Sequence, residues 1–157
     1  DTLFPDGSNH RLLEIGAGCG LSGLVAAALA GPGARTWLTD ENEVVLENLR
    51  WNVEANADCL GHGIEVSRLC WEEMLEGTTA PPTESLDLVL GSDVIWGDRG
   101  SLVGGVAMRL VRPGGYLIIS AQQGREGLDA FEAIVRKVGA NPDDRSLPFD
   151  VEILHTE

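Results

Sequence analysis

A short apolar run near the beginning of the chain, LLEIGAGCGLSGL, contains one acidic residue and regularly spaced glycines. Its first three glycines are Gly16, Gly18 and Gly20, and the pattern predicts a strand, a tight turn and a helix. Glycines let a ligand approach the backbone closely, and the N–H groups that begin the following helix point into the same space. We therefore predict that a nucleotide-like ligand binds at this turn.

Glu14, two residues before the first glycine, separates two classes of ligand. The spacing is G-x-G-x-G, and Leu21 stands where a dinucleotide fingerprint would have its third glycine. A carboxylate at Glu14 would repel a pyrophosphate, whereas it would attract the ammonium and sulfonium groups of S-adenosylmethionine directly or through water. We expect S-adenosylmethionine here, with a dinucleotide or a purely structural turn as the alternatives.

The composition is that of an ordinary globular protein. The chain has 157 residues, of which 43% are hydrophobic, and its mean hydropathy is close to zero. This length suits one domain with a substantial core, so we expect residues 1–157 to form a single S-adenosylmethionine-binding domain. The sequence has neither a signal-peptide pattern nor an apolar run near the roughly 18 residues that a membrane span needs.

The chain is strongly acidic, with 25 Asp and Glu residues against 11 Lys and Arg residues and a formal net charge of −14. This charge argues against nucleic acid as a partner and favours basic partners, with simple solubility as the alternative. Cys19, Cys59 and Cys70 lack C-x-x-C spacing and the three histidines are isolated, so we expect neither a metal site nor disulfides. We predict a cytoplasmic or nuclear monomer that does not bind membranes.

Hydrophobic periodicity and breaker residues predict strands that alternate with helices. The predicted strands are 11–15, 35–39, 64–69, 86–90, 116–121 and 151–155, and the predicted helices are 21–30, 43–57, 100–111 and 127–138. The segment RPGG at 112–115 is expected to separate a helix from a strand. The alternation predicts an α/β fold, a Rossmann-like, doubly wound, mostly parallel sheet with helices on both faces. In such sheets, ligands bind beyond the carboxyl ends of the strands.

Two residues at predicted strand ends are candidates for donor binding. Asp40 ends the second strand, where its carboxylate can accept hydrogen bonds from both ribose hydroxyls. Capping of the next helix is the alternative for Asp40, and the two roles are compatible. Trp71 follows the third strand, where an indole could cover an adenine, a contact worth about 1–3 kcal/mol for base–aromatic stacking. Packing at the rim of the core is the alternative for Trp71.

The segment GSDVIW follows the fourth predicted strand and is expected to face the reacting end of the donor. In it, Ser92 is expected to contact the donor, and Asp93 to hold an incoming amine with its lone pair aimed at the methyl group. Methyl transfer is an in-line displacement from an activated donor, so positioning and desolvation can lower the barrier without a strong base. Trp96 would line the substrate channel or make a cation–π contact with a lysine, with packing at the sheet edge as the alternative.

Four segments, LEIGAGCGLSGL, LTDENEVVLENLRWNVEAN, LCWEE and LDLVLGSDVIW, resemble the seven-β-strand S-adenosylmethionine-dependent methyltransferases. More narrowly, they resemble the family-16 group, which is similar to nicotinamide N-methyltransferase and contains many protein-lysine methyltransferases. The resemblance covers about residues 12–96 and, more loosely, the PGGYLIIS segment. Its most specific part is the second-helix pattern of Leu46, Leu49, Asn52, Val53 and Asn56.

The resemblance implies an N-methyltransferase, with a protein lysine as the expected substrate. A small-molecule methyltransferase and a non-catalytic, donor-binding scaffold domain are the alternatives. It implies that the donor is bound by Glu14, Gly16, Gly18, Asp40, Trp71 and the Ser92 region, with Gly20 completing the glycine turn. It also implies that the substrate is bound near Asp93 and Trp96, which we expect to be the catalytic residues.

The sequence departs from the family pattern in two ways. Family members commonly have Asp-x-x-Tyr after the fourth strand, whereas Trp96 occupies the fourth position here and brings no hydroxyl. The usual upstream aromatic helix and a clear seventh strand are not found, so we expect a fold that is truncated at its N-terminus and at the seventh strand.

Overall fold

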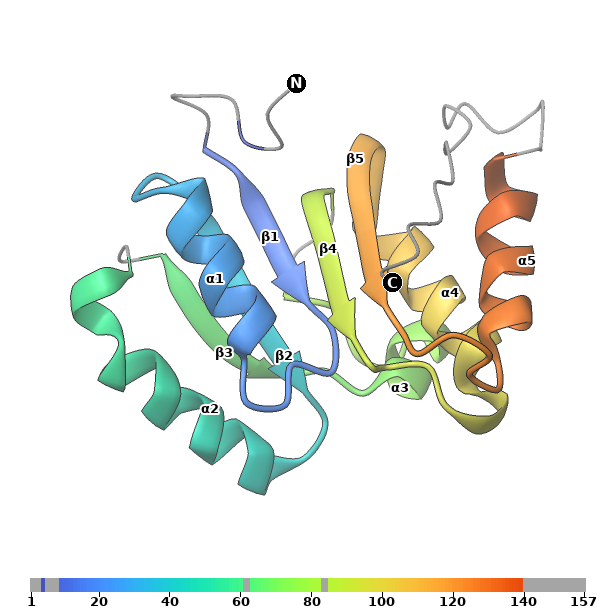
Figure 1. Cartoon of the computed structure of the whole chain (residues 1–157), viewed down its shortest axis with the longest axis horizontal. Helices are drawn as coiled ribbons and strands as arrows, with labels where there is room; N and C mark the ends of the chain where they lie inside the picture. Colours follow the sequence, from blue (N-terminus) through green and yellow to red (C-terminus); the bar gives the residue numbers. More distant parts are fainter. Residues whose placement is uncertain (1–3, 5–8, 61–62, 83–84, 140–157) are drawn as a thin grey trace.

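The computed structural model describes residue 4 and residues 9–60, 63–82 and 85–139 (Figure 1). The elements are, in chain order, β1 (Arg11–Glu14), α1 (Leu21–Ala30), β2 (Arg35–Asp40), α2 (Glu43–Ala55), η1 (Ala57–Cys59), β3 (Ile64–Arg68), α3 (Trp71–Glu76), β4 (Leu86–Ser92), η2 (Gly97–Arg99), α4 (Gly100–Leu110), β5 (Val111–Ser120) and α5 (Leu128–Gly139).

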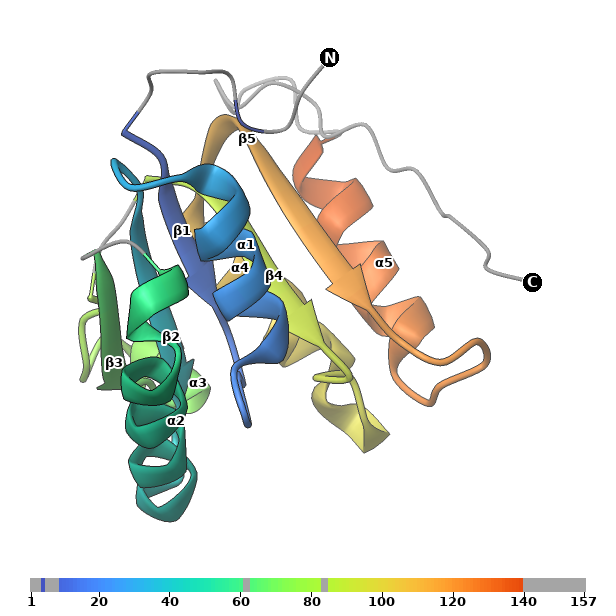
Figure 2. The same ribbon diagram turned by 60° about the vertical axis from the view of Figure 1, so that its left-hand side comes forward.

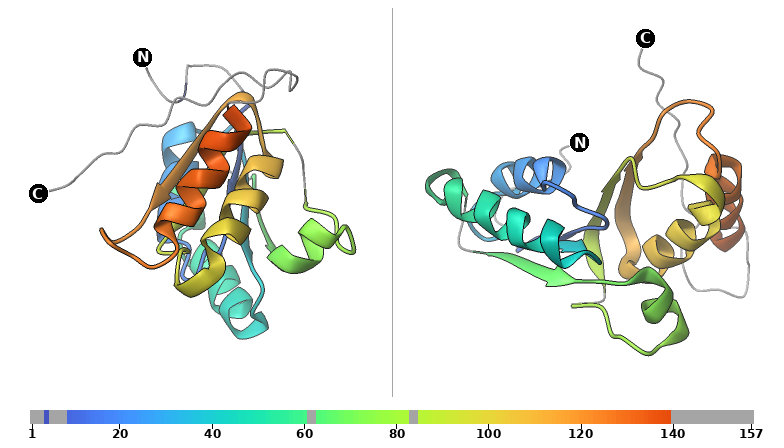
Figure 3. Two further views of the ribbon diagram at one scale, coloured as in Figure 1. Left: turned by 90° about the vertical axis from the view of Figure 1, so that its right-hand side faces the viewer. Right: turned by 90° about the horizontal axis from the view of Figure 1, so that it is seen from below.

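In the described part of the chain, five parallel strands form one sheet in the order β3-β2-β1-β4-β5. Figures 1 and 3 show α1 and α2 on one face of the sheet and α4 and α5 on the other, so the predicted doubly wound fold is confirmed. The arrowheads of β1, β4 and β5 point the same way in Figure 2. The strand order reverses between β1 and β4, and in open α/β sheets such a switch point is where ligands bind.

The strands nearest the switch point are buried on both faces, as expected for parallel strands that are covered by helices. In β1, Leu12 and Leu13 are both fully buried, but they belong to different clusters of the core. Leu13 packs in the cluster that includes α4 and α5, whereas Leu12 packs with residues of α1 and β4. This alternation fixes the register of β1 and therefore the position of the glycine turn that follows it.

Helix α1 lies close to the sheet because its inner face carries Gly23. A Cβ atom at Gly23 would lie 2.2 Å from Cδ2 of Leu38 and 2.5 Å from Oε2 of Glu14. Leu21 stands where a dinucleotide fingerprint would have its third glycine. The structure instead places the glycine that allows close helix–strand packing two residues later.

The structure differs from the sequence predictions at three segments. Helix α3 was not predicted, and the second helix ends at Ala55, before η1. The expected break at residues 112–115 lies inside β5, where those four residues bulge opposite one residue of β4, between the pairs Leu86–Val111 and Leu88–Tyr116. The predicted strand at 151–155 lies outside the described residues. Within the described ranges, no helix has the length and apolar character that crossing a membrane requires.

Candidate functional site

A pocket opens at the carboxyl ends of β1 to β4. The segments that follow these four strands provide its lining: Gly16, Asp40, Glu41, Leu69, Trp71, Asp93, Val94, Trp96 and Arg99. Five of these residues were proposed from the sequence, namely Gly16, Asp40, Trp71, Asp93 and Trp96. The other proposed residues, Glu14, Gly18, Gly20 and Ser92, are not part of the lining.

The glycine turn is fixed by main-chain hydrogen bonds to its neighbours. The amide of Ala17 donates to the carbonyl of Thr39 at 2.8 Å, and the amide of Gly20 donates to the carbonyl of Ala17 at 2.8 Å. Gly16 and Gly18 have φ angles of 58° and 55°, a backbone conformation that is strained for residues with a side chain. A Cβ atom at Gly16 would lie 3.2 Å from Cζ2 of Trp71. A Cβ atom at Gly18 would have no described residue within 4 Å other than its own chain neighbours.

Asp40 connects the glycine turn to the segment that follows β2. Its Oδ2 accepts a hydrogen bond from the amide of Gly18 at 3.2 Å, and its Oδ1 accepts one from the amide of Asn42 at 3.1 Å. The cap of α2 is Asn42, whose side chain accepts a hydrogen bond from the amide of Val44 at 2.9 Å. Asp40 is therefore not the side-chain cap of the helix, which was the alternative role considered for it.

Glu14 is 2% exposed and reaches the first turn of α1, where its Oε2 accepts a hydrogen bond from the amide of Gly23 at 2.9 Å. Burial raises the pKa of Glu14 from 4.5 to about 7, while hydrogen bonds from Gly23 and Ser22 act in the opposite direction. The carboxyl group therefore changes charge near neutral pH. Its role in donor binding stays a prediction.

The far side of the pocket contains two indoles and a guanidinium. Cζ of Arg99 lies 4.8 Å from the ring centroid of Trp96 and 5.9 Å from that of Trp71. The same guanidinium makes an ion pair with Glu72 at 3.0 Å. The side chain of Trp96 is 52% exposed and lines the pocket, so packing within the sheet edge does not describe it.

Asp93 leaves β4 in an unusual conformation. Its φ angle is 55°, and its amide donates to the carbonyl of Ser120 at 2.8 Å. Its carboxylate accepts a hydrogen bond from Arg125, which lies in the segment between β5 and α5. Ser92 is exposed and pairs with Ser120 of β5, and it does not line the pocket.

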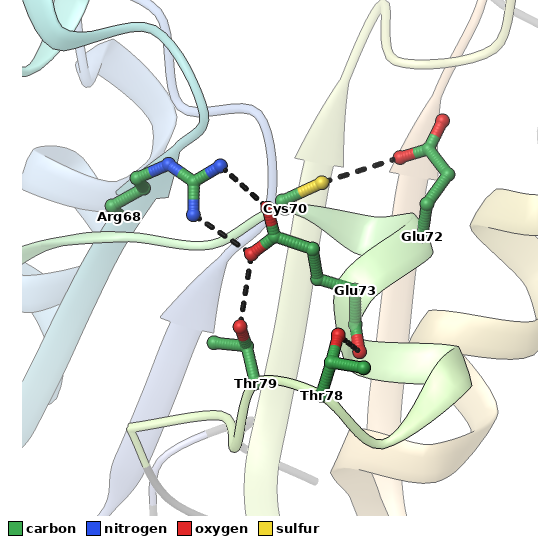
Figure 4. A network of polar contacts seen from close by, with 6 residues as sticks. All are labelled: Arg68, Cys70, Glu72, Glu73, Thr78 and Thr79. Atoms are coloured by element: carbon green, nitrogen blue, oxygen red, sulfur yellow. Dashed lines mark hydrogen bonds and ion pairs between the residues drawn. The ribbon is translucent and has the colours of Figure 1, made fainter.

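Helix α3, which begins at Trp71, is tied to β3 by polar contacts (Figure 4). The guanidinium of Arg68 donates to both carboxylate oxygens of Glu73, at 2.8 and 2.9 Å, and the hydroxyl of Thr79 donates to the same carboxylate at 2.9 Å. The hydrogen bond from Arg68, more than that from Thr79, lowers the pKa of Glu73 to about 2. These largely exposed contacts join the first turn of α3 to β3, while the buried side chain of Met74 and the partly buried Trp71 pack α3 against the core.

A family model described as lysine methyltransferase matches residues 4–131. The chain belongs to the lysine methyltransferase family. It is 45% identical over 85 residues to protein N-lysine methyltransferase METTL21A of Mus musculus. The matched region covers 54% of this chain and 36% of that protein. It is also 35% identical over 91 residues to histone-arginine methyltransferase METTL23 of Xenopus laevis. That match covers 57% of this chain and 36% of the Xenopus protein. The chain thus spans well under half the length of the curated relatives it matches.

Solved structures support the fold of this lysine methyltransferase family member. An arsenic(III) S-adenosylmethionine methyltransferase from Chlamydomonas reinhardtii matches with a TM-score of 0.60 and 26% identity, over 75% of this chain and 40% of that chain. The O-methyltransferase TomG from Streptomyces achromogenes matches with a TM-score of 0.62 and 17% identity, over 85% of this chain and 63% of that chain. The predicted Rossmann-like fold and the predicted family are therefore confirmed.

Several residues of the site could not be recognised in the sequence. Arg99 and Arg125 lie in polar segments after strands, where an arginine is usually solvated. Glu41 lies next to the predicted Asp40 and also lines the pocket. Glu41, Cys70 and Glu72 place their ligand atoms within 4.8 Å of one another, a grouping that sequence spacing does not reveal.

Proposed function

We propose that this family member is an S-adenosylmethionine-dependent N-methyltransferase that modifies a lysine of a protein. The observation that carries the proposal is the pocket itself. Residues from four separate strand ends, among them Asp40, Trp71 and Asp93, surround one space in a chain of the lysine methyltransferase family. The relatives that are named protein N-lysine methyltransferases support the substrate class.

The residues around the pocket suit the proposed donor. The open space at Gly18 leaves room for a ligand against the glycine turn, to which Gly16 and Gly20 also belong. Asp40 would bind the ribose hydroxyls and the Trp71 indole would cover the adenine, while Glu14 would provide negative charge for the methionyl ammonium. Ser92, at the end of β4, would contact the donor near its sulfur. When bound, S-adenosylmethionine supplies a methyl group on a positively charged sulfur.

The acceptor amine would be bound by Asp93 and Trp96, the proposed catalytic residues. A lysine ammonium must give a proton to solvent water before its lone pair can attack the methyl carbon. The nitrogen–carbon bond would then form as the carbon–sulfur bond breaks and S-adenosylhomocysteine leaves, so the main task of the protein is to hold the amine in line. The Asp93 carboxylate would accept an N–H hydrogen bond and set the direction of the lone pair, while the Trp96 indole would flank the lysine side chain.

The acidic composition supports a protein substrate whose methylated segment is basic. With a net charge of −14, the chain attracts Lys-rich and Arg-rich segments at long range and repels nucleic acid. The remaining parts of the proposal are that residues 1–157 act as one domain, that the chain is a monomer, and that it works in the cytoplasm or nucleus.

Two measurements test the proposed function. Calorimetric titration should show binding of S-adenosylmethionine and S-adenosylhomocysteine, and tighter binding of NAD would refute the donor assignment. Incubation of the chain with isotope-labelled donor and a cell extract, followed by mass spectrometry, should show one to three methyl groups on a protein lysine. Transfer only to small amines would make it a small-molecule methyltransferase, and donor binding without any transfer would make it a scaffold domain.

A further inference from the structure

Arg125 is the inner partner of an ion pair with Asp93. Its side chain is 30% exposed, whereas that of Asp93 is 66% exposed. Its Nη2 donates to Oδ1 of Asp93, and its Nε is buried without a hydrogen bond to any residue that the structure describes. In the described part of the chain, Asp93 is therefore the polar partner of this guanidinium.

The backbone around Arg125 is held as well. The amide of Arg125 donates to the carbonyl of Gln122 at 3.1 Å, and its own carbonyl accepts from the amide of Leu128 at 3.2 Å. These bonds join the segment after β5 to the first turn of α5, so the guanidinium extends from a fixed support. A cation on a fixed backbone can hold a mobile carboxylate in one orientation.

Asp93 needs such a support. Its backbone is fixed by the hydrogen bond to Ser120, but its carboxylate is mostly exposed and lies at the pocket. Among the described residues, Arg125 is the partner of this carboxylate, and it uses only Oδ1. Oδ2 is left to accept a hydrogen bond from an incoming amine.

We infer that Arg125 is a positioning residue, which acts through Asp93 by holding one carboxylate oxygen so that the other meets the substrate amine. This inference rests on the proposed function, because it needs an amine at Asp93. The competing interpretation is that Arg125 occupies the place of the substrate cation and must be displaced. The two interpretations predict opposite changes in kcat/KM when Arg125 is replaced. Loss of a positioning residue slows methyl transfer, whereas loss of a competitor accelerates it.

A double-mutant cycle on the full chain tests the inference. The variants are Arg125→Gln, Asp93→Asn and the double variant, assayed with a synthetic peptide that carries the lysine found in the transfer experiment. We expect Arg125→Gln to lower kcat/KM about tenfold, with S-adenosylhomocysteine affinity unchanged within about twofold. In the Asp93→Asn background, the same change should have no further effect, because Arg125 acts only through that carboxylate.

Two further variants control for charge and structure. Arg125→Lys keeps a cation at the site and should recover part of the lost kcat/KM, because the attraction to Oδ1 survives without the planar fork. Arg136→Gln removes an equal charge from the exposed pair with Glu132 on α5 and should leave the kinetics unchanged. A faster Arg125→Gln variant, or losses from Arg125→Gln and Asp93→Asn that multiply, would overturn the inference.

A second measurement needs no transfer. n-Butylamine, a mimic of the lysine side chain, can be titrated into the chain saturated with S-adenosylhomocysteine and followed by NMR. Arg125→Gln should weaken its binding, and Asp93→Asn should weaken it at least as much; unchanged or tighter binding by Arg125→Gln would overturn the inference. Absence of any methyl transfer by the unaltered chain would instead count against the proposed function, so the two failures are distinguishable.

Discussion

The two sides of the pocket are held by different kinds of contact. On the side of β1 and β2, main-chain amides make the decisive hydrogen bonds: Ala17 to Thr39, Gly18 to Asp40 and Gly23 to Glu14. On the opposite side, called the β4–β5 side here although Trp71 and Glu72 come from α3 after β3, the contacts join long side chains that are partly in water: Asp93 with Arg125, and Arg99 with Glu72 and the two indoles.

This difference has an energetic consequence. Hydrogen bonds to buried groups cannot be exchanged for water without a cost of about 1–3 kcal/mol, so the β1–β2 side keeps its shape. Exposed ion pairs contribute only about 0–1 kcal/mol to folding stability, so the pairs on the β4–β5 side add little to the free energy of unfolding, although Arg125 still sets the direction of the Asp93 carboxylate. For the proposed function, a rigid side suits the donor, which is the same molecule in every turnover, and an adaptable side suits a protein substrate.

The largest expected effect is on the rigid side, at Gly23. Replacement of Gly23 by alanine should lower the free energy of unfolding by about 3 kcal/mol, because the new methyl group collides with buried Leu38 and Glu14. Chemical denaturation measures the free energy of unfolding of the native chain and the variant. Gly105→Ala is the matched control, also inside a helix, where a Cβ meets only the end of the Leu75 side chain at 3.2 Å. That variant should be neutral or slightly stabilised, and an equal loss in both would mean that the close contact of α1 is unimportant.

The next effect concerns the buried charge of Glu14. The folded chain holds this proton more tightly than the unfolded chain, because burial raises the pKa from 4.5 to about 7. Ionisation therefore destabilises the fold progressively as pH rises from about 4.5 to about 7, and the full loss is present above that range. The stability advantage of Glu14→Gln over the native chain should therefore be about 2 kcal/mol larger at pH 8 than at pH 5.5. A difference that does not depend on pH would contradict burial of the charge.

A smaller effect is expected at Asp40, which belongs to both the rigid side and the donor site. Asp40→Ala should weaken S-adenosylhomocysteine binding by about 1–2 kcal/mol through loss of hydrogen bonds to the ribose. Asn42→Ala, which removes the cap of α2, should lower stability by about 1 kcal/mol and leave donor affinity unchanged. Titration calorimetry measures the donor affinity of both variants, and thermal unfolding measures their stability. Unchanged affinity in a folded Asp40→Ala variant would mean that Asp40 only holds the turn.

The contacts of the rigid side are the ones that local sequence patterns can indicate. Its contacts follow from local patterns: glycines at fixed spacing, an acidic residue at each of two strand ends, and a small-residue helix that begins at Leu21, as predicted. Gly23 was overlooked because its role depends on Leu38, a residue of another strand. Sequence spacing shows which residues are neighbours along an element, but not which side chains meet across elements.

The adaptable side illustrates that limit. Asp93 and Arg125 are separated by 32 residues, and nothing in either local pattern indicates a pair. Helix α3 was missed because the residues from Trp71 to Glu76 are too few to show helical periodicity. Its packing depends on the buried side chain of Met74 and on contacts with other elements. The bulge in β5 was read as a break because Pro and Gly usually end an element, whereas here the pairing resumes at Tyr116.

The smallest expected effect sharpens the comparison from the adaptable side. Trp96→Tyr keeps an aromatic face for the Arg99 guanidinium, now 4.8 Å from the indole centroid, and adds the hydroxyl that family members commonly carry. Because Trp96 is 52% exposed, stability should stay within about 0.5 kcal/mol, and kcat/KM for the lysine peptide should change by less than about threefold. Trp96→Ala removes the aromatic face altogether and should lower kcat/KM by more than Trp96→Tyr does. A tenfold gain in Trp96→Tyr would instead mean that this position requires a hydroxyl, and that the β4–β5 side is more specific than its exposed contacts indicate.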